Sequence, residues 1–76
     1  SPTQILRDMS KQLRKEIYKT AFELSELFPE KPSLEAGLDE EIAYTKELLQ
    51  TLEEGIETCG NKKIRKLSQE MKKLLV

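Results

Sequence analysis

A chain of 76 residues with a net charge of −1, of which 37% are apolar and 36% charged, forms one small domain with little core to spare. Because it has no histidine and a single cysteine, its composition excludes an imidazole base, an ordinary zinc site and an internal disulfide. Its three glycines are scattered along the chain, so no phosphate-binding loop is expected. We therefore expect a protein that is not an enzyme and that uses no cofactor or metal.

The first helix is predicted over residues 3–28. Ser1 can cap it and Pro2 suits its first turn, whereas Pro29 should end it and open a stiff connector over residues 29–33. Its apolar residues recur at steps of three and four, the spacing of one helical face: Leu6, Met9, Leu13, Ile17, Leu24 and Leu27 or Phe28.

The second helix is predicted over residues 34–59, with Ser33 as its cap. A start after Gly37, at Asp39, is the alternative, and both starts place acidic residues in the first turn, where the helix dipole favours them. Alternating steps of four and three form a heptad seam typical of left-handed, coiled-coil-like packing: Leu38, Ile42, Thr45, Leu49, Leu52, Ile56 and Cys59.

A row of small and large residues lies beside this seam: Gly37, Tyr44, Leu48 and Gly55. An interior glycine weakens a helix but lets another element approach its backbone closely. We interpret the row as an ordinary crossing with a neighbouring helix, with self-association as the alternative.

The stretch TLEEGIETCGNKK, residues 51–63, raises the question of a ligand-binding loop. Gly55 is assigned to the second helix, Cys59 to its last core position and Gly60 to its C-cap, while Asn61 caps the next helix. The sequence therefore predicts a helix end and a tight corner, with Cys59 in the core and not a nucleophile.

The third helix is predicted over residues 62–75, with Ile64, Leu67, Met71, Leu74 and Leu75 on one face. Three such stripes without any strand pattern predict an all-α fold, a three-helix up-down-up bundle over residues 1–76. An antiparallel coiled-coil hairpin that dimerises is the alternative. The first and last residues of the chain suggest a domain cut from a larger protein.

Charge is segregated along the chain. The net charge is +1 over residues 1–29, −7 over residues 30–59 and +5 over residues 60–76. The face of the third helix opposite its apolar stripe is basic and forms a candidate site for an acidic partner or an anionic membrane surface: Lys62, Arg65, Lys66, Lys72 and Lys73. We do not expect nucleic acid there, because no aromatic residue is interleaved with these cations and the neighbouring helix is acidic.

Tyr18 and Phe22 lie one helical turn apart but away from the apolar stripe of the first helix. Either the helix is distorted near Thr20 and Ala21, or the two rings form an exposed apolar patch. Together with Lys11 and Lys15 they form our candidate partner-binding site, because exposed paired aromatics suggest an interface.

These features favour an intracellular protein–protein interaction module, cytoplasmic or nuclear, since a lone cysteine suits a reducing compartment. The alternatives are a homodimer formed through the heptad seam and a binder of anionic surfaces through the third helix. No apolar run reaches the roughly 18 residues that a transmembrane helix needs.

The last helix, NKKIRKLSQEMKKLL, resembles the final helix of transcription-elongation-factor N-terminal domains, and the placement of LFPEKP and TKELL is similar to BAG domains. Co-activator KIX domains and the N-terminal bundles of vesicle-fusion proteins share the same spacing. Because unrelated families agree in hydrophobic spacing alone, the resemblance indicates the architecture, and we assign the chain to none of them.

Overall fold

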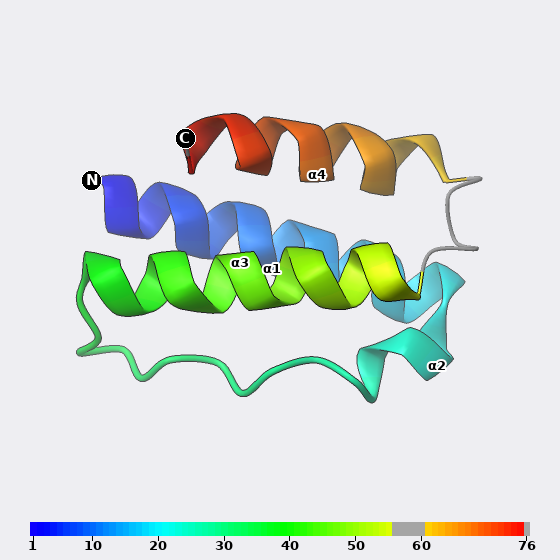
Figure 1. The fold of residues 1–76 in the computed structure, drawn as a ribbon, viewed down its shortest axis with the longest axis horizontal. Coiled ribbons are helices and arrows are strands. Elements are labelled where there is room, and N and C mark those ends of the chain that lie inside the picture. Colours follow the sequence, from blue (N-terminus) through cyan, green and yellow to red (C-terminus); the bar gives the residue numbers. More distant parts are fainter. Residues whose placement is uncertain (56–60, 76) are drawn as a thin grey trace.

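The computed structural model describes residues 1–55 and 61–75, so Ile56, Cys59 and Gly60, to which the sequence assigns core and cap positions, lie outside the described residues. The helices are α1 (Pro2–Thr20), α2 (Phe22–Ser25), α3 (Leu38–Glu54) and α4 (Lys62–Leu74). Helices α2, α3 and α4 all pack against α1 (Figure 1), which confirms the all-α bundle. None of the helices in the described ranges combines the length and apolar character needed to cross a bilayer.

Helix α1 begins as predicted but ends early. The Ser1 hydroxyl accepts a hydrogen bond from the Gln4 amide at 3.3 Å, and Pro2 occupies the first turn. At Ala21 the backbone leaves the helical region (φ −149°, ψ 58°), and only the four residues of α2 are helical beyond it. The prediction of one helix over residues 3–28 is therefore wrong. The break allows the Leu24 side chain to be buried against Gly55 at the end of α3.

Residues 26–37, here called the strap, contain turns at residues 26–27 and 34–35 and no regular secondary structure between them, and they run back along the length of the molecule (Figure 1). Pro29 and Pro32 lie within it. Each proline fixes its own φ and disfavours helix at the residue before it, so this part of the chain stays extended. The strap therefore returns the chain to the end of the bundle at which α1 began.

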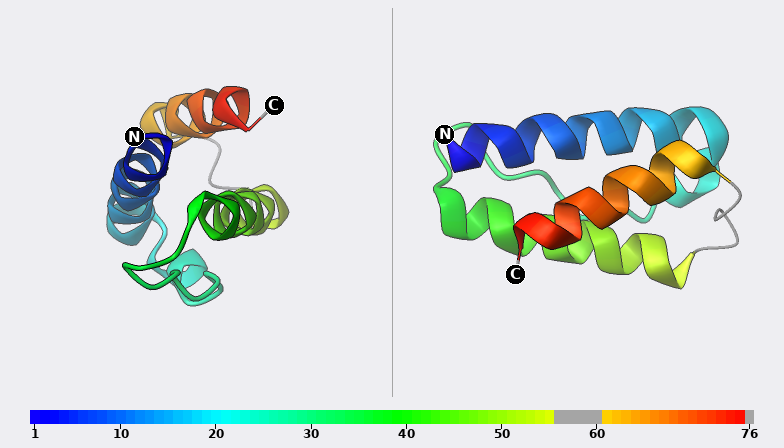
Figure 2. Two further views of the ribbon diagram at one scale, coloured as in Figure 1. Left: turned by 90° about the vertical axis from the view of Figure 1, so that its left-hand side faces the viewer. Right: turned by 90° about the horizontal axis from the view of Figure 1, so that it is seen from above.

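This return determines the direction of α3. Contacts of α1 and α2 with later residues follow the same order along both segments: Arg7 bonds to Glu41, Arg14 bonds to Tyr44, and Leu24 of α2 lies beside Gly55. Helices α1 and α3 thus run in the same direction, and α4 runs antiparallel to both (Figures 1 and 2). The bundle differs here from the predicted up-down-up order, because residues 26–37 are long enough and extended enough to connect two parallel helices.

The ends of α3 differ from the longer helix that we expected. Gly37 is its N-cap, so the preferred start at Ser33 is wrong and the alternative start after Gly37 agrees within one residue. Its first turn contains Asp39, Glu40 and Glu41, which the helix dipole favours. Gly55 is the C-cap and not an interior residue, but the predicted close approach is present: a Cβ on Gly55 would lie 2.2 Å from Cδ1 of Leu24.

Helix α3 buries a broader face than the heptad seam. Thr45, Leu49 and Leu52 of the seam are buried, but Leu38 and Ile42 are not fully covered. Tyr44 and Leu48, which the sequence places on the flank, are buried as well. A helix with two neighbours needs a wide apolar stripe, so the flanking row is a crossing within the bundle, as we preferred.

Helix α4 confirms the prediction for residues 62–75 within one residue. The Asn61 side chain accepts hydrogen bonds from the amides of Lys63 (2.9 Å) and Ile64 (3.2 Å). Ile64 and Met71 join the central cluster, whereas Leu74 is exposed. The core cluster is completed by buried residues of α1, α2 and α3: Leu13, Ile17, Leu24, Tyr44, Leu48, Leu49 and Leu52.

Arg7 fastens the strap and α3 to α1. Its Nη2 atom donates to the carbonyl oxygens of Ser33, Leu34 and Ala36 at 3.5, 3.1 and 3.0 Å, and its Nε atom donates to Glu41 Oε2 at 3.1 Å. The Glu41 side chain is only 3% exposed. A buried carboxylate needs a charged, hydrogen-bonded partner, and Arg7 supplies it. We call this group of contacts the Arg7 clasp.

We predict that Arg7→Met lowers the free energy of unfolding by about 3–5 kcal/mol, because it leaves the Glu41 carboxylate buried without its partner. Lys11→Met, one turn further along the same helix and exposed, should change it by no more than about 0.5 kcal/mol. Urea unfolding followed by circular dichroism measures both. Arg7→Met/Glu41→Leu should recover most of the loss; a double variant as unstable as Arg7→Met would contradict this role of the carboxylate.

The two glycines of α3 should respond in opposite directions. Gly55→Ala should destabilise the fold by about 1–3 kcal/mol, because its Cβ would overlap Leu24 in a packed site. Gly37→Ser should be neutral or stabilise by roughly 0.5 kcal/mol, since nothing lies within 4 Å of a Cβ there and a serine hydroxyl can cap the helix. Thermal unfolding compares them, and equal effects would contradict the contact between α2 and α3.

Candidate protein-binding surface

Tyr18 and Phe22 are both exposed and in contact. Their side chains lie on either side of the break at Ala21, with the ring centroids 4.8 Å apart in an edge-to-face arrangement at 79°. Tyr18 is 60% exposed and Phe22 is 50% exposed. Both outcomes that the sequence left open therefore occur together: the helix is distorted at Ala21, and the two rings form an exposed patch.

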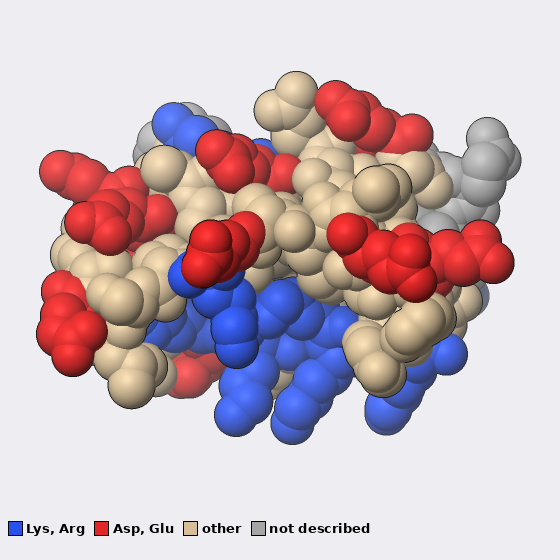
Figure 3. All heavy atoms as spheres, turned by 90° about the horizontal axis from the view of Figure 1, so that it is seen from below, with Lys and Arg blue, Asp and Glu red and all other residues tan. Residues whose placement is uncertain are grey.

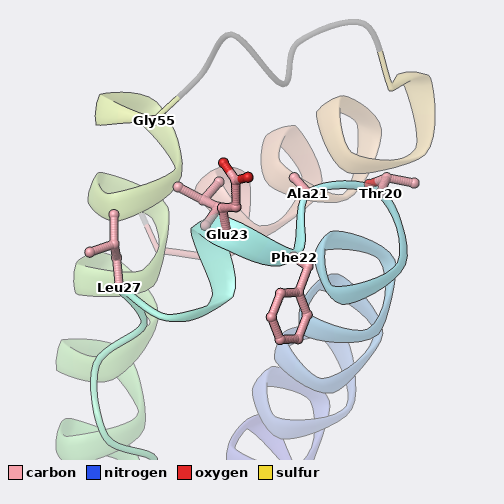
Figure 4. Close-up of a pocket in the computed structure, with 7 residues that line it drawn as sticks. Thr20, Ala21, Phe22, Glu23, Leu27 and Gly55 are labelled. Atoms are coloured by element: carbon pink, nitrogen blue, oxygen red, sulfur yellow. The ribbon is translucent and has the colours of Figure 1, made fainter.

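The aromatic pair separates two hollows on the surface. On the Phe22 side, α2 and the end of α3 surround a hollow with Leu27 and Gly55 among its lining residues (Figure 4). The figure shows the Phe22 ring beside α1, in agreement with its contact with Tyr18. On the Tyr18 side, α1 and the strap form a second hollow of about 450 Å³, here called the strap groove, lined by Arg14, Lys15, Tyr18, Ser25, Phe28, Pro29 and Lys31.

The predicted lysines occupy different parts of this surface. Lys15 lines the strap groove together with Tyr18, so the structure brings these two predicted residues into one site. Lys11 is exposed and lines a neighbouring hollow with Arg7 and Lys31, without either ring of the pair. Lys11 therefore belongs to the charged border of the surface and not to its apolar part.

Sequence reasoning missed residues that the strap brings to the site. Phe28 was assigned to the first helix, and Pro29 and Lys31 to a connector, but all three line the strap groove. Their signal in the sequence was the pair of prolines at 29 and 32, which keeps the segment extended. Proline spacing does not show on which face of α1 the segment packs.

Arg14 is held by a neutral partner. Its Nη1 atom donates to the Tyr44 hydroxyl at 2.7 Å, and its guanidinium carbon lies 5.7 Å from the centre of the Tyr44 ring. Burial raises the pKa of the Tyr44 phenol above its ordinary value of 10.0, although the charge and the hydrogen bond of Arg14 oppose this shift. Tyr44 is uncharged at neutral pH, so its hydroxyl positions Arg14 without neutralising it, and the hollow that these two residues share is also lined by Glu41, whose charge also raises the pKa of Tyr44.

The basic residues of α4 have different surroundings. Lys62, Lys66 and Lys73 are exposed, as is Arg65. Lys72 forms an ion pair with Glu53 of α3, and it lines a hollow between α3 and α4 with Arg65. Lys66 lies instead in a hollow between α1 and α4, with Lys15, Lys19 and Lys63 but also with Glu16 and Glu70.

The charge segregation of the sequence is visible on the surface. Figure 3 views the face that carries the strap, with α3 along its upper edge and α1 along its lower edge. Lys and Arg side chains gather along the α1 edge, whereas Asp and Glu side chains lie towards α3, at the ends and over the middle of the face. Tyr18 of the aromatic pair thus lies on the helix with the basic edge, and Phe22 follows on α2.

Other sites have less support in the structure. The central seam residues Thr45, Leu49 and Leu52 are covered by the chain itself. Within residues 1–55 and 61–75, no cluster of three or more acidic or cysteine side chains is arranged to hold a metal ion. Comparisons with protein-family models, curated proteins and solved structures found no match to this chain. The surface around Tyr18 and Phe22 therefore has to be interpreted from its own geometry.

We predict that Phe22→Ala lowers the free energy of unfolding by less than about 1.5 kcal/mol, because the ring is half exposed and its main partner is Tyr18. Leu13→Ala, at a fully buried position, should cost about 2–5 kcal/mol. Urea unfolding of both variants makes the comparison. A loss as large for Phe22 as for Leu13 would show that Phe22 belongs to the core.

The Tyr44 phenol should titrate later in the folded protein than in the unfolded chain. Its raised pKa means that the folded state prefers the neutral form, so the stability it contributes is present below pH 10 and is lost as the pH rises through the folded pKa. In a Tyr18→Phe variant, tyrosinate absorbance reports Tyr44 alone, since the chain has two tyrosines. A midpoint no higher than that measured in urea would contradict its burial beside Arg14.

Proposed function

We propose that this domain is a non-enzymatic protein–protein interaction module whose partner binds on the surface formed by Tyr18, Phe22 and the cations around them. The observation that carries the proposal is the exposed edge-to-face pair. Aromatic side chains are enriched among the residues that dominate binding energy at interfaces. Most exposed apolar residues of a small domain are scattered singly, whereas paired rings beside two hollows offer a continuous apolar area.

The pair is also well positioned for binding. Its two rings are attached to adjacent helices, and Ile17 and Leu24 next to them are buried in the core. The backbone that carries the rings is therefore fixed, so little conformational entropy is lost when a partner binds. The cations on α1 and the acidic residues of α3 then favour some partners and disfavour others.

The two other hypotheses have weaker support. A homodimer through the heptad seam would need Thr45, Leu49 and Leu52 at its centre, and the chain already buries them. An anionic surface bound through α4 would need its cations together, but Lys72 is paired with Glu53, and Lys66 shares its hollow with Glu16 and Glu70. Neither arrangement offers a continuous surface like that of the aromatic pair.

Selection from a random-peptide phage library tests the proposal. We expect the wild-type domain to enrich peptides that lose most of their binding to a Tyr18→Ala/Phe22→Ala variant. An Ile5→Ala/Leu74→Ala variant is the matched control, because those side chains are 50% and 53% exposed elsewhere on the surface; it should bind normally. Truncating interface anchors typically costs more than about 2 kcal/mol of binding free energy, or roughly thirtyfold in affinity.

Circular dichroism would confirm that both double variants remain folded. Peptides that bind equally to the aromatic variant would place the interface elsewhere, and a selection that enriches none would contradict a peptide-binding role for this surface.

A further inference from the structure

The strap groove has apolar lining residues, here called its floor, and charged lining residues of one sign, here called its rim. Phe28 and Pro29 of the strap and Tyr18 of α1 supply its apolar surface. Arg14, Lys15 and Lys31 supply three positive charges, and no acidic residue lines it. None of these three cations forms an ion pair with any residue in the described ranges 1–55 and 61–75.

Other hollows on the surface have a different character. The hollow beside Gly55 contains Glu23, and that between α3 and α4 contains Glu53. The lysine-lined hollow between α1 and α4 contains Glu16 and Glu70, and the one at the Arg7 clasp contains Asp8 and Glu41. In each of these a carboxylate offsets part of the positive charge. Arg14 and Lys31 also line the hollow at the clasp, but no carboxylate lines the strap groove itself.

Arg14 is a cation of the groove whose direct hydrogen-bond partner is neutral. The two arginines of α1 both reach towards α3, seven residues apart in the sequence. Arg7 meets the Glu41 carboxylate, whereas Arg14 meets the Tyr44 hydroxyl, which positions the guanidinium without neutralising it. A partly buried cation with a neutral partner is well suited to bind an incoming anionic group.

We infer that the strap groove binds an acidic segment of the partner protein. A phenylalanine, leucine or similar side chain of that segment packs on Phe28 and Pro29 beside Tyr18, and flanking carboxylates lie against the cations of the rim. This inference rests on the proposed function and specifies the chemistry of the partner. The apolar floor selects for the anchor side chain, and the three cations select for acidic neighbours.

A short acidic segment fits the surroundings of the groove better than an extended polyanion does. Glu26 and Glu30 belong to the strap on the N-terminal side of Lys31 and are exposed. A nucleic acid backbone or an anionic bilayer covers a wide area and would come close to these carboxylates, at an electrostatic cost. A peptide can place its carboxylates at Arg14, Lys15 and Lys31 and avoid them.

The peptides selected from the phage library test the inference. We expect them to carry Asp or Glu within a few residues of an aromatic or large aliphatic side chain. The most enriched peptide, synthesised with a fluorescent label, should bind the wild-type domain with an affinity that falls as salt rises. A version with Asn and Gln in place of Asp and Glu should bind at least about tenfold more weakly, a difference of 1.4 kcal/mol.

A matched pair of charge reversals locates the binding site. Lys31→Glu in the groove and Lys46→Glu on α3 change the net charge equally, and both side chains are exposed. We expect Lys31→Glu to weaken the labelled peptide by about tenfold or more, because a like charge then faces its carboxylates. Lys46→Glu should change the affinity by less than about threefold.

Three results would overturn the inference. One is selection of peptides without acidic residues that still depend on Tyr18 and Phe22; the proposed function would then stand without this partner chemistry. Another is equal weakening by Lys31→Glu and Lys46→Glu, which would indicate attraction by net charge alone. The third is failure of acidic peptides to bind while phosphatidylserine vesicles bind in a Lys31-dependent manner, which would assign the groove to a membrane surface.

Discussion

The Arg7 guanidinium is the group on which the arrangement of α1, the strap and α3 depends. It lies on α1, bonds to three strap carbonyls and forms an ion pair with a carboxylate in the first turn of α3. The Glu41 carboxylate would be costly to bury alone, since it needs a cation, and the partly buried bond to the Ala36 carbonyl adds to this, whereas the bonds to Ser33 and Leu34 lie at the surface. One side chain thus satisfies the polar groups at the place where the extended segment joins the next helix.

The position of the candidate binding surface depends on the Arg7 clasp. The strap starts beside α2 and ends at the clasp, so its middle lies along α1 and carries Phe28, Pro29 and Lys31 to the side of Tyr18. If α3 ran antiparallel to α1, a short turn would connect them and no such groove would form. A three-helix bundle does not require its first and second long helices to be parallel. In this domain the parallel direction of α1 and α3 requires the strap, and the strap places apolar residues between cations.

The sequence predicted the helical class, the caps at Ser1 and Asn61, and the exposure of the aromatic pair, because these depend on local spacing and on residues one turn apart. It offered a distortion near Ala21 only as an alternative to exposure of the rings, because the break has no local breaker residue and depends on packing of Leu24 against Gly55. The start of α3 was misplaced because Leu34 continues the apolar spacing, yet in the fold it is 85% exposed. The strap groove is lined by residues of α1, α2 and the strap. The hydrophobic periodicity of the sequence does not specify how these three segments are placed relative to one another.

The direction of α3 relative to α1 is the central claim, and paramagnetic relaxation enhancement measures it directly. A spin label at Gln4→Cys, in a Cys59→Ser background, lies in α1 beside the hollow that Glu41 also lines. The parallel arrangement predicts strong broadening of amide signals from Gly37 to Glu41 and little broadening from Thr51 to Glu54. Broadening of residues 51–54 with residues 37–41 unaffected would show an antiparallel α3, and would contradict both the clasp and the groove that it positions.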